Sequence, residues 1–108
     1  MQKPVILKRV AKKQASLPRA SDYAKTFLKD WVRLSNSGRY DMVRLKVAML
    51  LLIGADEPLG PEWKDHALSG KLANFRECHV GGDFLLMYQL DGNAIVFVRA
   101  GTHAELFE

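Results

Sequence analysis

The chain has 108 residues, of which 48% are hydrophobic and 26% charged. This length suits one domain with a single core, and no apolar run approaches the roughly 20 residues of a membrane span. The single cysteine, Cys78, excludes an internal disulfide framework and fits a reducing compartment. Because the N-terminal residues also lack the apolar segment of a signal peptide, we expect a cytoplasmic protein with no membrane partner.

The net charge of +4 is concentrated at the N-terminus. Residues 1–20 hold six bases and no acid, so residues 21–108 hold ten bases and twelve acids and have a net charge of −2. We therefore expect a basic arm over residues 1–16 and a nearly neutral domain over residues 17–108. Such an arm attracts nucleic acid or an acidic partner, and the alternative is a solvated, disordered tail. Its candidate RNA contacts are Lys8, Arg9, Lys12 and Lys13.

Two helices are predicted after the arm. Leu17-Pro18-Arg19 is compatible with a short edge strand, where proline is tolerated. Ser21 or Asp22 can cap a helix that ends at residues 35–38, since apolar residues then recur at helical spacing. Asp41 can cap a second helix that ends at Gly54. The short connection between them predicts an antiparallel helical hairpin.

Three strands are predicted in the second half of the chain, after an ordered loop that contains His66. They lie near residues 75–80, 84–90 and 94–99, joined by Gly81-Gly82 and by the strong turn signal Asp91-Gly92-Asn93. This order predicts an α+β domain in which the helical hairpin packs on one face of an antiparallel sheet of about four strands. With a three-residue turn at 91–93, Leu85 would face Arg99 and Asp83 would face Gly101.

The candidate reactive groups cluster near strand ends. Thr102-His103-Ala104-Glu105 fits a capping box, which predicts a short C-terminal helical turn that begins at His103. The free N–H groups of such a turn favour phosphate. The alternative is that Thr102 only caps the C-terminal turn and has no role in binding. His66 and His79 are the other histidines, and no pair of the three has the spacing of a structural zinc site. We therefore expect no metal and no other cofactor.

Three segments, "WKDHALSG", "RECHVGGDFLLMYQL" and "VFVRAGTHAELF", together resemble the YafQ branch of the RelE/ParE toxin superfamily. The resemblance covers residues 17–107 and implies the toxin of a type II toxin–antitoxin pair. It implies an endoribonuclease, an mRNA interferase that cuts mRNA in the ribosomal A site without metal. The implied partners are a cognate antitoxin protein and the 70S ribosome with its mRNA and 16S rRNA.

The resemblance also assigns site residues. It implies catalytic roles for His66, His79, Asp83 and His103, phosphate binding by Arg99 and Thr102, and an aromatic contact from Phe107. The chain departs from the family pattern at Phe84, where a relative can have tryptophan, at the Gly81-Gly82 turn, and at Glu77, where aspartate can be found. These departures bear on codon preference more than on the chemistry.

The residue types suit metal-free RNA cleavage, in which the ribose 2′-OH attacks its own 3′ phosphate. The reaction needs a base, an acid and positive donors for the phosphate, and imidazole can serve as either acid or base near neutral pH. We expect His103 to be the acid, His79 or Asp83 the base, and His66 to orient the substrate. Two alternatives are a non-catalytic ParE-like toxin that inhibits DNA gyrase and a basic RNA- or DNA-binding module without turnover.

Overall fold

The computed structural model describes residues 17–107, so the basic arm predicted for residues 1–16 lies outside the described residues. A strand β1 and two helices come first: β1 Ala20–Tyr23, α2 Lys25–Ser37 and α3 Met42–Gly54. Two short 3₁₀ turns, η1 Pro61–Trp63 and η2 Gly70–Leu72, flank the strand β2 His66–Ala67. The chain then forms β3 Arg76–Gly81, β4 Phe84–Asp91, β5 Ala94–Thr102 and α4 His103–Phe107.

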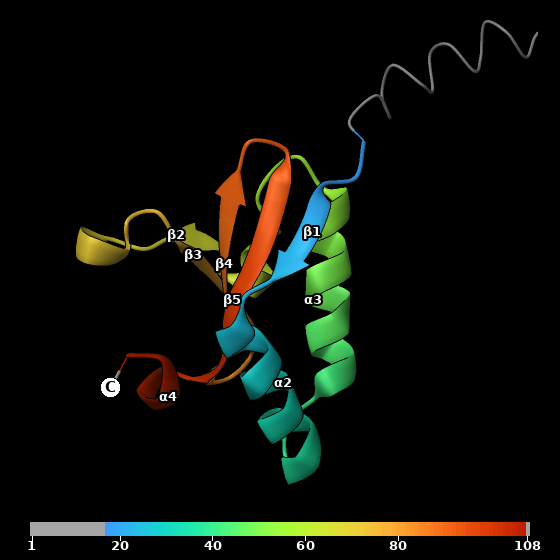
Figure 1. The fold of residues 1–108 in the computed structure, drawn as a ribbon, viewed down its shortest axis with the longest axis vertical. Coiled ribbons are helices and arrows are strands. Elements are labelled where there is room, and N and C mark those ends of the chain that lie inside the picture. The colour runs from blue at the N-terminus through green and yellow to red at the C-terminus, as the bar shows by residue number, and fades with distance from the viewer. Residues whose placement is uncertain (1–16, 108) are drawn as a thin grey trace, which may run out of the picture.

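The strands form one five-stranded sheet in the order β1-β5-β4-β3-β2, with α2 and α3 together on one side of it (Figure 1). The predicted α+β class and helical hairpin are therefore confirmed. The prediction of about four antiparallel strands is wrong, because the sheet has five strands and β1 runs parallel to β5. The edge strand expected at residues 17–19 lies at Ala20–Tyr23 instead, and β2 turns part of the expected loop into a strand.

Helix α2 begins later than predicted because β1 occupies residues 20–23. Neither Ser21 nor Asp22 caps the helix, because both belong to β1, and the N–H of Ala24 continues the ladder by donating to the Phe97 carbonyl at 2.9 Å. Helix α2 ends as expected at Gly38, whose φ of 69° is the left-handed conformation typical of a helix C-terminus. Asp41 caps α3 as predicted, since its Oδ1 accepts from the Arg44 N–H at 2.9 Å.

The hydrophobic core lies between the helical hairpin and the facing side of the sheet. Fully buried residues from both layers fill it, among them Phe27, Leu34, Leu45, Ala48, Cys78, Val80, Leu86, Ile95 and Phe97. Cys78 is thus the small buried residue that free cysteines most often are. Burial, with smaller effects of the nearby Asp65 and Glu77 carboxylates, raises the pKa of its thiol to about 12.

The register of β4 against β5 differs from the prediction because their hairpin turn contains two residues rather than three. Gly82-Asp83 joins β3 to β4 and Gly92-Asn93 joins β4 to β5, so Leu90 faces Ile95. A β-bulge after Met87 then shifts the register by one further residue, and Leu85 faces Gly101 rather than Arg99. Asp83 consequently lies in the turn itself and faces no residue of β5 in the ladder.

Candidate active site

A carboxylate lies between two of the three histidines. The pairing of β2 with β3 sets His66 opposite Glu77, and Glu77 and His79 share one face of β3 because side chains alternate along a strand. Glu77 Oε1 is 3.9 Å from His66 Nε2 and 3.8 Å from His79 Nε2. The two imidazole rings are 6.3 Å apart between centroids. Glu77 is only 6% exposed, so its side chain is nearly buried between the two imidazole rings.

Glu77 is the site residue that the sequence analysis did not assign. It was noted only as a departure from the family pattern. The available signal was its position two residues before His79 in a predicted strand, which puts both side chains on the same face. Glu77 belongs to the site because it contacts His66. His66 lies in β2, a two-residue strand that is too short to predict from sequence.

A groove of about 390 Å³ extends from this cluster to α4. His66 and Glu77 line one part of it, and His103 and Phe107 of α4 line another. The His103 and Phe107 rings contact each other, with centroids 4.8 Å apart. The remaining lining residues are Leu68, Ser69 and Leu72. His79 is not part of this lining and reaches the cluster through Glu77, so His66 and His103 are the imidazoles that share the groove.

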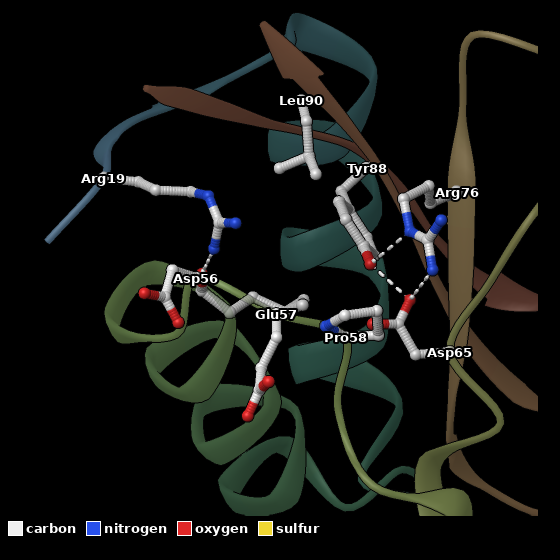
Figure 2. A pocket seen from close by; sticks show the side chains of 9 residues that line it. Arg19, Asp56, Glu57, Pro58, Asp65, Arg76, Tyr88 and Leu90 are labelled. Carbon is white, nitrogen blue, oxygen red and sulfur yellow. Dashed lines mark hydrogen bonds and ion pairs between the residues drawn. The ribbon is translucent and has the colours of Figure 1, made fainter. Parts of the chain in front are cut away.

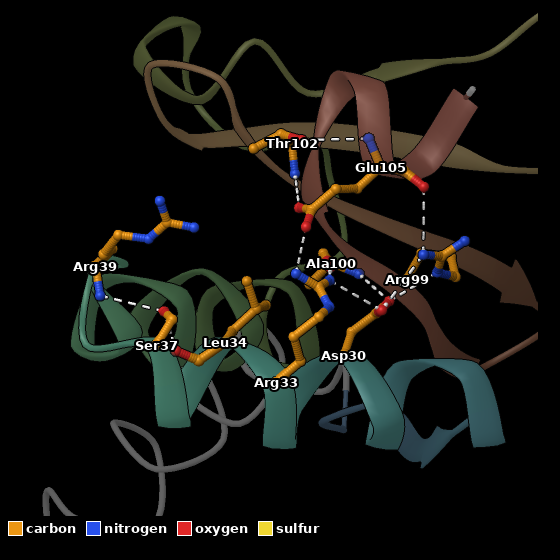
Figure 3. Close-up of polar contacts among 9 residues, drawn as sticks. All are labelled: Asp30, Arg33, Leu34, Ser37, Arg39, Arg99, Ala100, Thr102 and Glu105. Carbon is orange, nitrogen blue, oxygen red and sulfur yellow. Dashed lines mark hydrogen bonds and ion pairs between the residues drawn. The ribbon is translucent and has the colours of Figure 1, made fainter.

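The position of α4 is fixed by the predicted capping box, which is confirmed (Figure 3). Thr102 Oγ1 accepts from the Glu105 N–H at 3.2 Å, and the Thr102 N–H donates to Glu105 Oε1 at 2.7 Å. Asp83 adds a third contact, because its Oδ1 accepts from the His103 N–H at 3.1 Å. The β3–β4 turn and α4 are thereby fastened together, and His103 begins the helix as expected.

Arg99 is held by a buried partner on α2 (Figure 3). Its Nε donates to Asp30 Oδ2 at 2.7 Å, and Asp30 also accepts from the Ala100 N–H at 3.0 Å. Burial would raise the pKa of Asp30, but the hydrogen bonds from Arg99, Ala100 and Arg33 outweigh it and hold that pKa below its ordinary value. Conversely, the bond to Asp30 raises the pKa of Arg99 against the smaller opposing effect of burial.

The same contacts tie Arg99 to the groove side of the molecule. Its Nη2 is 3.4 Å from the Glu105 carbonyl oxygen, and Arg33 pairs with both Asp30 and the Glu105 carboxylate. Arg99 therefore stands beside α4 as a guanidinium of fixed orientation that is still 30% exposed. The structure thus brings His66, Glu77 and His79 together on one side, and Asp83, His103, Phe107 and Arg99 on the other.

Residues 17–107 contain neither a metal-binding cluster nor a membrane-spanning helix. No three histidine, cysteine, aspartate or glutamate side chains in this range are arranged to hold a metal ion. No helix in the same range is long and apolar enough to cross a membrane.

A helical hairpin on one face of a small sheet, with a histidine-lined groove beside α4, defines a domain of the α+β class. The family model described as the bacterial toxin of type II toxin–antitoxin system, YafQ, matches residues 19–108. The chain therefore belongs to the YafQ family of type II toxins, which confirms the family that the three segments resemble.

Relatives extend this result. The mRNA interferase toxin YafQ of Escherichia coli strain K12 is 40% identical over 91 residues, which cover 84% of this chain and 98% of the relative. The crystal structure of YafQ from E. coli strain BL21(DE3) is similar with a TM-score of 0.76 at 39% identity, covering 83% of this chain and 99% of that one. The YafQ chain of the E. coli DinJ–YafQ toxin–antitoxin complex is similar with a TM-score of 0.75 at 39% identity, covering 85% and 100%.

Proposed function

We propose that this chain is an mRNA interferase that cleaves mRNA in the ribosomal A site, by attack of the ribose 2′-OH on the adjacent phosphate. The observation that carries the proposal is the groove shared by His66 and His103. It brings one imidazole backed by a buried carboxylate and a second imidazole at a capped helix terminus to one concave surface. The related E. coli toxin carries the name mRNA interferase, which gives the reaction class.

His103 is the general acid of the proposed mechanism. It would donate a proton to the leaving 5′ oxygen, and its ring is supported by Phe107. Arg99 and the Thr102 hydroxyl stabilise the charge that develops on the phosphate, and the bond of Arg99 to Asp30 fixes the orientation of its planar fork. Asp83 helps to position His103, because its Oδ1 accepts from the His103 N–H.

His66 is the general base that the groove favours. Its Nδ1 is 2.6 Å from the Lys64 carbonyl oxygen. Because a carbonyl only accepts hydrogen bonds, Nδ1 carries a proton and the neutral ring has its lone pair on Nε2, the atom nearest Glu77. That lone pair can accept the 2′-OH proton, and the Glu77 carboxylate stabilises the imidazolium that forms. The groove thereby favours His66 over His79 and Asp83, the bases expected from the sequence.

The proposed partners follow from the chemistry and from the relatives. Residues 21–108 have a net charge of −2, so we expect the ribosome to supply affinity and to align the mRNA. Purified toxin should accordingly cut free RNA poorly, and the site of action is the cytoplasm. A cognate antitoxin, as in the related DinJ–YafQ complex, would bind the toxin in the resting cell, and its co-expression should relieve toxicity.

The test is single-turnover cleavage on programmed ribosomes between pH 5 and 9. His103→Ala should lose about a hundredfold in rate, the usual contribution of a positioned acid, while binding ribosomes normally and melting at an unchanged temperature. His66→Ala should also lose activity and should alter the pH dependence of the rate on its acidic side, where a base must be unprotonated. A His103→Ala variant that cuts at a near-normal rate would overturn the acid assignment. Growth inhibition that survives without any RNA cleavage would favour a protein target such as gyrase.

A further inference from the structure

A buried polar cluster lies directly behind His66 and is not used in the proposed mechanism. The Asp65 side chain, only 1% exposed, accepts from the Tyr88 hydroxyl, from the Leu59 N–H at 3.0 Å and from Arg76 Nη2 at 3.4 Å. Arg76 Nε also donates to the Tyr88 hydroxyl oxygen at 3.1 Å. Figure 2 shows the three side chains of Asp65, Arg76 and Tyr88 converging on one another.

The cluster belongs to the opposite face of the sheet from the groove. Asp65 and His66 are neighbours at the start of β2, and Arg76 and Glu77 are neighbours in the paired strand β3, so within each pair the side chains point to opposite faces. Asp65 accordingly meets Arg76 on the side of the core, whereas His66 meets Glu77 on the side of the groove. Residues 65–66 are therefore bound to β3 on both faces of the sheet, through Asp65 on one face and His66 on the other.

The backbone that leads into His66 needs such support. Lys64 has a φ of 48°, and among residues 17–107 no other non-glycine residue has a positive φ. This left-handed residue turns its carbonyl back toward the His66 ring, which donates to it from Nδ1. A conformation of this kind persists where neighbouring contacts determine it, and here the contacts are those of the next residue, Asp65.

We propose that Asp65, with Tyr88 and Arg76, is a positioning group that fixes the tautomer and the orientation of His66. The three contacts to Asp65 hold residues 64–66 in the turn that presents the Lys64 carbonyl to Nδ1, and this leaves the lone pair of the neutral ring on Nε2. Burial raises the pKa of the Tyr88 phenol, and its hydrogen bond to Asp65 raises it further, so Tyr88 remains a donor throughout the working pH range. This inference deepens the proposed function and rests on the role of His66 in it.

The decisive variant is Tyr88→Phe, because it removes one hydroxyl and leaves the aromatic ring in the core. The rate of single-turnover cleavage on programmed ribosomes should fall about tenfold, since a small misplacement of a catalytic group is costly. The same substitution should cost nothing in a His66→Ala background, because the residue it positions is gone. Ile95→Val is the matched control: it trims a fully buried side chain of β5 and should lower the melting temperature slightly without changing the rate in either background.

A second readout does not depend on cleavage. The ring nitrogens of His66 in the full-length toxin should give the signals of an Nδ1–H tautomer in ¹⁵N NMR, and Tyr88→Phe should shift these signals, whereas Ile95→Val should not. Equal losses of rate in both backgrounds would overturn the inference, as would unchanged His66 signals in the Tyr88→Phe variant. If His66→Ala alone cuts normally, the proposed base is wrong, and the NMR comparison still decides whether Asp65 positions the ring.

Discussion

At the scale of single residues, the site depends on side chains whose partners lie far away in sequence. Glu77 would be an ordinary strand residue without His66, eleven positions earlier, and Arg99 would be an exposed cation without Asp30 on α2. The histidines could be predicted as site residues because their residue type is itself a signal. Glu77 and Asp30 could not be predicted, because acidic residues are common and only the tertiary contacts distinguish these two.

The role of Glu77 gives one prediction. Replacing it with glutamine keeps the shape of the side chain but removes the negative charge between His66 and His79, so we expect cleavage to slow about a hundredfold. Asp91→Asn makes the same change in charge at an exposed position at the end of β4 and is the control. Single-turnover rates on programmed ribosomes compare the two. Equal, small effects of both substitutions would mean that Glu77 has no part in the chemistry.

Asp30 gives a prediction about stability. Because its pKa in the folded protein lies below its ordinary value of 3.8, ionised Asp30 stabilises the fold above that pH, and this contribution disappears as the pH falls through the lowered pKa. Asp30→Asn should therefore lose about 2 kcal/mol at pH 7, where Arg99 loses an ionic partner. The difference in melting temperature between this variant and the wild type should narrow progressively below pH 4. A difference that stays constant down to pH 2 would contradict the assignment.

At the scale of elements, local signals predicted the parts of the fold that are determined locally. Three such signals are confirmed: the Asp41 cap, the helix end at Gly38 and the capping box at 102–105. The turn signal at 91–93 correctly predicted a hairpin, although the turn has two residues rather than three. The edge strand was expected at residues 17–19 and not at Ala20–Tyr23, because all four side chains of β1 are exposed and show no apolar alternation. Its existence depends on pairing with β5, more than 70 residues later, and the bulge in β5 is likewise a property of the sheet.

Helix α4 should depend on its cap. Thr102→Ala removes the oxygen that accepts from the Glu105 N–H, which should cost about 1 kcal/mol locally and loosen the helix that carries His103 and Phe107. Amide exchange at Glu105 should accelerate, and cleavage should slow, while global unfolding changes little. Ser37→Ala removes a comparable bond, the one from the Arg39 N–H at the far end of α2, and should leave both measurements unchanged (Figure 3). Unaltered exchange in Thr102→Ala would show that Asp83 and Arg33 suffice to hold α4.

At the scale of the whole molecule, the first described residues and the groove lie at opposite ends of the sheet. Because β1 runs parallel to β5 with Ala20 opposite Ala94, the described chain begins beside the start of β5, whereas Thr102 and His103 lie at its end. Eight residues of strand separate the two ends, about 26 Å. Arg19 fastens this beginning to the body, since its guanidinium donates to the carbonyls of Leu52 and Ala55 at the end of α3. The described chain therefore begins at a fixed point remote from the proposed chemistry.

This geometry makes a distinct prediction for the arm, which carries five of the sixteen bases. If Lys8, Arg9, Lys12 and Lys13 contact ribosomal RNA, removing residues 1–16 should weaken ribosome binding and flatten its dependence on salt, because fewer counterions are released. The cleavage rate of toxin already bound should not change, since the groove is about 26 Å away along β5. A variant with these four bases replaced by glutamine keeps the length of the arm and should reproduce the deletion. Arg19 stays in both variants, so the melting temperature should be constant.

A salt slope equal to that of the wild type would leave the arm as a solvated tail, whereas a slower rate in the bound state would mean that it reaches the groove.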